Sequence, residues 1–278
     1  GQNPETGVTL DYYLPVAADS FEVKLQIVDS QGNVIRNYSS KKNADFKSFP
    51  GGPPAPKVIP AAKGLNRFAW DFKSETLPEI PNAFVYGDYT GYKLAPGKYK
   101  AIISGKDTTS ETEIEVLQDP NLKEVKPTDW AGQQSFIKDV ESRIKDVHNS
   151  VNEMRKVKKQ IIQYNEVIKD NPQYKDLHAE GKSLLDKINK WEEQLVQTKQ
   201  SNFQDVINFP SMLNAQYFEL KGFVDQHDPR LPQSAKERLK DIDGQWKQYK
   251  EYINDTIGKD ILKYNDLYKS SNVPALIL

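Results

Sequence analysis

Apolar and polar residues alternate along several short segments of the first half of the chain. The clearest are residues 8–14, 21–27 and 65–72, and further alternating segments follow Gly97. A period of two is typical of β-strands with one buried and one exposed face. About six or seven short strands in a segment of this length predict an immunoglobulin-like β-sandwich over residues 1–119.

Apolar residues in the second half recur at spacings of three and four, which is typical of amphipathic helices. The longest series, from Ile137 to Ile168, predicts one helix over residues 128–169. Breaks at Pro172 and Pro210 divide the rest into a second long helix, a shorter one and a last long one. Because the connections are short, we expect an antiparallel up-and-down bundle.

The distribution of helix-breaking residues supports a division into two domains. The first 127 residues hold 12 of the 17 prolines and 10 of the 15 glycines. A breaker-rich segment followed by a breaker-poor one favours a β domain followed by a helical domain. We therefore expect a multi-domain α+β protein, with a sandwich over 1–119, a linker over 120–127 and a helical bundle over 128–278.

Composition and charge exclude several classes of protein. The chain has 38 Lys plus Arg against 39 Asp plus Glu, a formal net charge of −1, which argues against a generally basic nucleic-acid binder. The absence of cysteine excludes disulfide scaffolds, thiol nucleophiles and cysteine-ligated metals. No apolar run approaches the roughly 18 residues of a membrane span. No signal peptide is visible, and the first residues resemble a trimmed or mature end.

The sequence carries no familiar catalytic or cofactor motif. It has no glycine-rich phosphate loop, G-x-S-x-G elbow, H-E-x-x-H helix or EF-hand loop. The tightest group of potential ligands is Asp225, His227 and Asp228, and we expect it to act at a helix end rather than to bind a metal. His148 and His178 are interpreted as exposed or edge residues. We predict no catalytic residue, metal or cofactor.

A densely basic run, Arg155-Lys156-Val157-Lys158-Lys159, lies within the first predicted helix. Such runs are usually a solvated helix face, and the neutral charge of the whole domain argues against a nucleic-acid role. Lys158 is unusual because it occupies a position of the apolar series.

An aromatic segment over residues 82–96 offers a candidate ligand site. It carries Phe84, Tyr86, Tyr89 and Tyr92, together with Asp88. Exposed rings of this kind can stack on the faces of sugars while a carboxylate accepts hydrogen bonds from hydroxyl groups. The alternative, which we favour, is that the rings pack beneath the loop and seal the sandwich, because aromatic side chains contribute so much burial energy.

Three motifs carry a resemblance to a known family. They are Gly64-Leu65-Asn66-Arg67-Phe68-Ala69-Trp70-Asp71-Phe72, Leu94-Ala95-Pro96-Gly97-Lys98-Tyr99-Lys100 and Leu117-Gln118-Asp119-Pro120. With them the chain resembles the C-terminal region of bacterial secreted, sortilin-like propeller proteins with BNR (Asp-box) repeats, which are often labelled glycosyl hydrolases. The resemblance extends over nearly the whole chain.

The resemblance implies export to the periplasm or the cell surface of a Gram-negative bacterium. It assigns no active-site residue, because no Asp-box (S-x-D-x-G-x-x-W) occurs in the sequence and the propeller is therefore absent. It implies as partner the protein's own N-terminal propeller or another cell-envelope protein.

Three functional hypotheses follow. The leading one is a non-catalytic C-terminal interaction and positioning module. The second is a carbohydrate-binding module with Tyr86, Tyr89 and Tyr92 as the stacking platform, which requires those rings to be exposed and roughly coplanar. The third is a glycoside hydrolase with paired carboxylates in a cleft, for which the sequence shows no convergent polar pocket.

Overall fold

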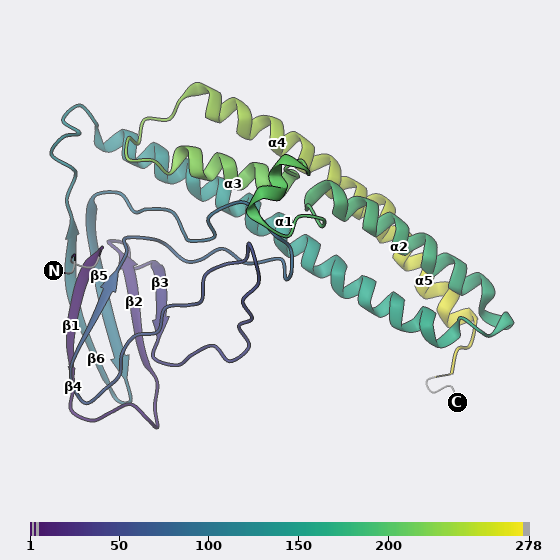
Figure 1. The fold of residues 1–278 in the computed structure, drawn as a ribbon, viewed down its shortest axis with the longest axis horizontal. Coiled ribbons are helices and arrows are strands. Elements are labelled where there is room, and N and C mark those ends of the chain that lie inside the picture. Colours follow the sequence, from purple (N-terminus) through teal and green to yellow (C-terminus); the bar gives the residue numbers. More distant parts are fainter. Residues whose placement is uncertain (2, 4–5, 275–278) are drawn as a thin grey trace.

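A computed structural model describes residues 1, 3 and 6–274 of the chain, and in these residues a β unit is followed by five α-helices (Figure 1). The β unit consists of six strands in two antiparallel sheets and their connecting loops. A two-stranded sheet joins β1 (Val8–Leu14) to β4 (Gly64–Trp70). The four-stranded sheet has the order β3-β2-β5-β6, with β2 (Val23–Asp29), β3 (Val34–Ser39), β5 (Gly97–Gly105) and β6 (Thr108–Val116).

Aromatic residues join the two sheets. The ring of Tyr38 lies 4.7 Å from that of Phe68, edge to face, and the ring of Trp70 lies 6.0 Å from that of Tyr99. Leu25 and its apolar neighbours fill the space between the sheets. The alternation of apolar residues therefore predicted correctly that these segments are strands with one buried face.

The helical region begins with one 42-residue helix, α1 (Pro127–Ile168). Its N-terminus is capped by Asp129, whose carboxylate accepts a hydrogen bond from the backbone N–H of Lys126 at 2.8 Å. The helices that follow are α2 (Lys175–Leu195), α3 (Leu213–Val224), α4 (Gln233–Tyr252) and α5 (Gly258–Ser270). Short turns η1 (Pro172–Tyr174) and η2 (Phe203–Ile207) precede α2 and α3, and the π-helical turn η3 (Ile253–Ile257) joins α4 to α5.

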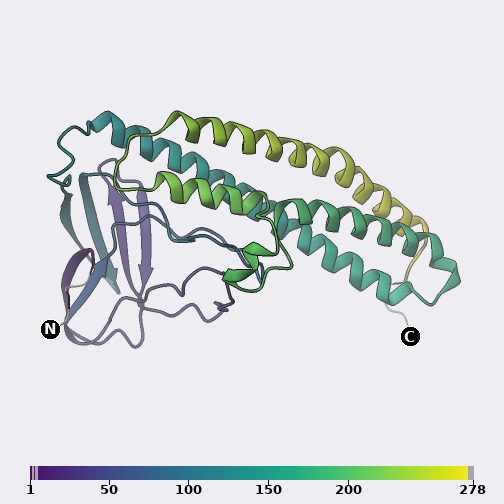
Figure 2. The ribbon, with the colours of Figure 1, turned by 45° about the horizontal axis from the view of Figure 1, so that its top comes forward.

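These segments form three rows rather than a simple up-and-down bundle (Figure 2). α4 and α5 make one continuous row that runs parallel to α1. α2 and α3 share the remaining row, end to end, and both run antiparallel to α1. Cross-helix contacts fix these directions: Gln133 Nε2 donates to Val224 O at 2.8 Å, whereas Lys158 pairs with Glu192 at 2.7 Å.

In an up-and-down bundle each helix runs opposite to the one before it. That prediction is wrong for α2 and α3, because these two helices run in the same direction. α2 ends near the level of Arg155 on α1, which would leave the apolar side chains from Ile137 to Val151 without a cover on this side. α3 continues the row and covers them, and these side chains are buried. The connection over residues 196–212 includes η2, and it leads the chain from the end of α2 to the start of α3 without reversing its direction. No helix among the described residues has the length and apolarity to cross a membrane.

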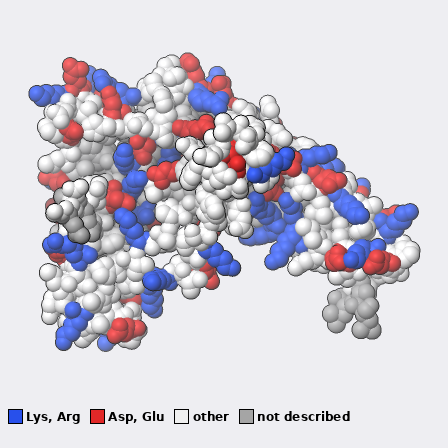
Figure 3. All heavy atoms as spheres, viewed as in Figure 1, with Lys and Arg blue, Asp and Glu red and all other residues white. Residues whose placement is uncertain are grey.

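The unusual Lys158 has a structural explanation. Glu192 of α2 is almost completely buried, and its carboxylate is paired with both Arg155 and Lys158 of α1 at 2.7 Å. Although burial raises the pKa of Glu192, hydrogen bonds from these two cations hold it below its usual value. Two members of the basic run thus pair inside the bundle, and charges of both signs are interspersed over the face shown in Figure 3.

Replacing Ile144 by Ala should lower the free energy of unfolding by about 2–5 kcal/mol, because the side chain is fully buried and its removal leaves a cavity. Ile162 lies on the same helix but is 53% exposed, so Ile162→Ala should change stability by less than about 0.5 kcal/mol. Urea titrations followed by circular dichroism measure both. Equal losses would contradict the assigned apolar face of α1.

Candidate functional site

The long connection between β4 and β5, residues 71–96, leaves the sheets and lies against α1 and α3 (Figures 1 and 2). We call it the β4–β5 loop. Backbone hydrogen bonds close its base: Leu94 N donates to Phe72 O at 2.9 Å, and Ser74 N donates to Tyr92 O at 3.0 Å. The two ends of the loop are thus hydrogen-bonded to each other, while its middle extends away from the sheets. The loop contains the aromatic segment over residues 82–96.

The structure does not expose these rings as a sugar-stacking platform. Phe84, Tyr89 and Tyr92 are 4%, 1% and 8% exposed, and among the candidate rings only Tyr86, at 51%, faces solvent. The ring of Tyr89 packs 4.9 Å from that of Phe218 on α3. The alternative that we favoured, in which the rings pack beneath the loop, holds for Phe84, Tyr89 and Tyr92 but not for Tyr86. The buried rings pack against the helical region as well as against the sandwich.

Asp88, the predicted acceptor for sugar hydroxyls, is engaged inside the loop. Its carboxylate accepts hydrogen bonds from the backbone N–H of Thr90 at 2.8 Å and from the Thr90 hydroxyl, and it pairs with Lys73 at 3.2 Å. Burial acts to raise the pKa of Asp88, but the hydrogen bonds from Thr90 and the charge of Lys73 bring it below its usual value. The group therefore shapes the turn that carries Tyr89.

The loop is held by a row of polar side chains on α1 that repeats every seven residues: Gln134, Glu141, His148 and Arg155. Each reaches the backbone of the β4–β5 loop, as does Asn152. Their partners and distances are Lys93 O at 2.9 Å for Gln134, Tyr92 N at 3.1 Å for Glu141, Pro78 O at 2.8 Å for His148, Pro81 O at 2.6 Å for Arg155 and Glu79 O at 2.8 Å for Asn152.

We call this set of contacts, together with Lys221 and Asp225 from the end of α3, the loop–helix joint. Lys221 Nζ donates to Asp88 O at 3.1 Å and to Thr90 O, and the Asp225 carboxylate accepts from Lys93 N at 3.1 Å. The sequence did not predict this role: Arg155 was interpreted as part of a solvated face, His148 as an exposed or edge residue and Asp225 as a helix-end residue. The repeat of seven next to the apolar series was the signal available.

A buried ion pair lies at the centre of the joint. Glu141 and Lys221 are each 3% exposed, and their charged atoms are 3.8 Å apart. Burial raises the pKa of Glu141 to about 7, and the charges of Lys221 and Lys145 offset this only in part. Burial likewise lowers the pKa of Lys221 against the attraction of Glu141. Desolvation thus outweighs the mutual attraction of the pair.

His148 is fully buried, so its interpretation as an exposed or edge residue is wrong. Its Nδ1 lies 2.8 Å from the carbonyl of Pro78, a contact that requires this nitrogen to carry a proton. Burial lowers the pKa of His148 to about 4, so the ring stays neutral near pH 7. Packed 5.7 Å from the ring of Phe218, it acts as a donor within the core.

The group Asp225, His227 and Asp228 is divided among separate partners. Asp225 belongs to the joint, His227 pairs with Asp119 at 3.0 Å, and Asp228 pairs with Arg230. Across the residues that the structure describes, no cluster of three His, Cys, Asp or Glu side chains is suited to hold a metal ion.

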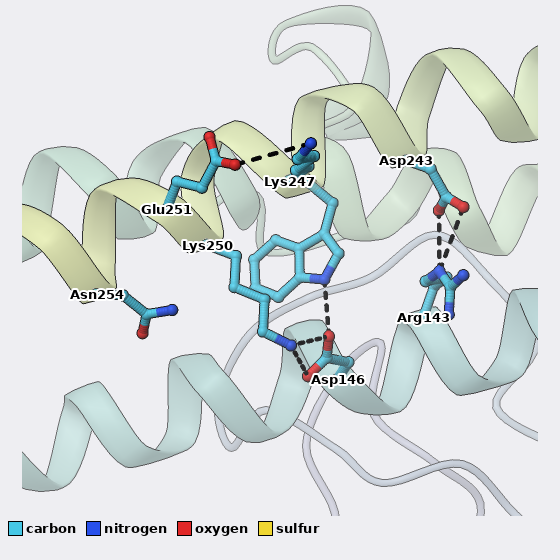
Figure 4. Close-up of a pocket in the computed structure, with 8 residues that line it drawn as sticks. Arg143, Asp146, Asp243, Lys247, Lys250, Glu251 and Asn254 are labelled. Atoms are coloured by element: carbon cyan, nitrogen blue, oxygen red, sulfur yellow. Dashed lines mark hydrogen bonds and ion pairs between the residues drawn. The ribbon is translucent and has the colours of Figure 1, made fainter.

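A hollow of about 420 Å³ lies between α1 and α4 (Figure 4). Two ion-pair groups cross it: Arg143 Nε pairs with Asp243 at 3.1 Å, and Lys250 Nζ pairs with Asp146 at 2.7 Å. Trp246 Nε1 also donates to Asp146 at 2.9 Å. Burial raises the pKa of Asp146, but hydrogen bonds from Lys250 and Trp246 lower it overall. Both carboxylates thus act in joining the two helices.

The titration of Glu141 should appear in the pH dependence of stability. Its pKa rises from 4.5 in the unfolded chain to about 7 on folding, so its contribution is complete below pH 4.5 and is lost as the pH rises through about 7. Glu141→Gln keeps an acceptor for Tyr92 N but does not titrate. The stability of the native protein relative to this variant should fall by roughly 3 kcal/mol across that range.

Urea titrations of both proteins at a series of pH values measure this difference. His148 acts in the opposite sense, because its pKa falls from 6.5 to about 4 and its contribution is lost as the pH decreases. It is present in both proteins and cancels from the difference. Parallel curves for the two proteins would show that Glu141 does not titrate in this way.

Comparison of the chain with protein-family models, curated proteins and solved structures finds no match. The resemblance therefore rests on the three sequence motifs, whose residues have structural roles here. The Asn66 side chain accepts from Ala62 N at 3.0 Å and donates to Gly64 O at 3.0 Å, and Tyr99 OH donates to Ala95 O at 2.7 Å. Trp70 is fully buried.

Proposed function

We propose that this chain is a non-catalytic interaction and positioning module, in which the β unit is locked to a projecting helical arm. By the arm we mean α1 beyond Arg155 together with α2 and α5, which extend away from the sheets in both ribbon views (Figures 1 and 2). The observation that carries the proposal is the loop–helix joint. It fixes the direction of the arm relative to the β unit.

The joint combines hydrogen bonds with apolar packing. Leu77, Ile80 and Tyr89 of the β4–β5 loop belong to the same buried cluster as Val147 and Val151 of α1. The β unit and the helices therefore share one continuous core, and their relative orientation does not depend only on the segment 120–127. A shared core of this kind resists the swinging that a connection by a flexible linker alone would permit.

Exposed apolar side chains supply candidate contact surfaces for a partner. Next to the joint, Phe203 of η2 is 62% exposed and its ring lies 5.6 Å from that of Tyr86, and Ile207 is 84% exposed. On the arm, Val167 and Leu262 are 55% and 64% exposed. Exposed apolar groups of this size support a role in protein contacts.

We further propose that the β unit is an immunoglobulin-like sandwich. β1 and β4 would correspond to strands B and E, and β3, β2, β5 and β6 to strands C′, C, F and G. The motif resemblance suggests that the partner is a propeller of the same exported protein or another cell-envelope protein of a Gram-negative bacterium.

Rigidity of the joint can be measured by double electron–electron resonance, since the chain has no cysteine and two spin labels can be placed freely. Gln31→Cys in the β unit and Ser183→Cys on α2 are exposed positions. We expect a single narrow distance distribution, because one core joins both labels. A label pair within one helix, Ser183→Cys with Lys190→Cys, gives the width of the distance distribution expected for a rigid body. A much broader distribution between the β unit and the arm would overturn the positioning role.

A further inference from the structure

One side of the β unit is open between the two sheets. β1 pairs with β4 and β6 pairs with β5, and no strand within the described residues joins β1 to β6. These two free edges border a groove with a volume of about 810 Å³. Each edge strand presents unpaired backbone N–H and C=O groups, which can template pairing with another strand.

The floor of the groove is apolar and only partly covered. Leu10, Val23, Leu25 and Ala101 are buried at its base, where the two sheets meet. Thr112 of β6 lies two residues from the buried Ile114 and so projects from the same face of the strand, yet it is exposed. The groove thus has an apolar floor that no strand among the described residues covers.

The rim of the groove is acidic. Five acidic residues and a single base, Lys106, are among the described residues that line it: the acids are Asp11, Asp107, Glu111, Glu113 and Glu115. Two of these acids already have partners: Asp11 pairs with Arg67 at 2.7 Å and Glu111 with Lys100 at 2.9 Å. Glu113 and Glu115 lie opposite Lys100 and Lys98 of β5 in the sheet, but neither forms a salt bridge with a described residue, so each can still pair with an incoming cation.

We propose that this groove binds an extended strand of a partner protein in which apolar residues alternate with Lys or Arg. The apolar side chains would face the floor, the cations would lie beside Glu113 and Glu115, and the backbone would pair with a free edge. This deepens the proposed interaction role by naming the chemistry of its partner. A second copy of the chain is disfavoured as occupant, because edge-to-edge pairing through β6 would oppose these same acids.

The test uses the isotope-labelled full chain and a capped peptide of alternating Val and Lys, about as long as the seven-residue β1. A peptide of identical composition, with all Val residues before all Lys residues, is the control for charge alone. Amide hydrogen exchange and chemical-shift changes report binding residue by residue. We expect the alternating peptide to bind and to slow exchange at amides of β1, β6 or both, and the block peptide to leave exchange unchanged.

Two variants test the rim and the floor. The pair Glu113→Lys with Glu115→Lys should weaken binding by about tenfold or more. Glu153→Lys with Glu193→Lys makes the same charge change at exposed positions on α1 and α2 and should alter it less than about twofold. Thr112→Trp should fill the groove and abolish binding, with unchanged thermal unfolding because Thr112 is exposed.

Three results would overturn the proposal. They are no binding of the alternating peptide, equal protection by the block peptide, and protection of these edges without peptide in a chain that light scattering shows to be a dimer. If the alternating peptide does not bind, the acids would instead serve to prevent strand pairing at these edges. If the edges are protected in a dimer without peptide, the occupant would be a second copy of the chain. None of them bears on the spin-label distances, so the positioning role stands or fails separately.

Discussion

The structure depends on side chains of α1 that form hydrogen bonds with the backbone of the β4–β5 loop. Pro78 and Pro81 lack an N–H group, so this stretch of the β4–β5 loop cannot pair as a regular strand, and its carbonyl groups need donors from elsewhere. His148 and Arg155 supply them from α1. The contact with Pro78 is partly buried and the contact with Pro81 is exposed, so loss of the His148 donor should weaken the packing of the loop more than loss of the Arg155 donor.

This dependence explains why the joint contains groups that are costly to bury. Glu141 and Lys221 lose more in desolvation than they gain from each other, as their opposed pKa shifts show. Replacement by apolar groups would relieve that cost but would leave Tyr92 N and the carbonyls of Asp88 and Thr90 without partners. The pair thus fixes the register of the loop on the helices, a gain in specificity rather than in stability.

Local periodicity predicts the elements of this fold but not how they meet. The apolar series from Ile137 to Ile168 marks α1 almost to the residue, because burial of one helical face leaves a spacing that the sequence preserves. The partners of His148 and Glu141 lie some 50 to 70 residues away, and nothing local indicates them. For the same reason the burial of Tyr89 depends on α3, which arrives more than a hundred residues later.

The backbone groups of the β unit have different hydrogen-bond partners at the joint and at the groove. At the joint, helix side chains satisfy a loop that cannot pair as a strand, and that side is closed. At the groove, free edges over an apolar floor remain open to solvent, and acids such as Glu113 stand beside them. A strand is the ligand that satisfies both the backbone groups and the floor, and the acids restrict its sequence. Because the joint fixes the arm, a strand held in the groove would be held at a fixed position relative to the arm.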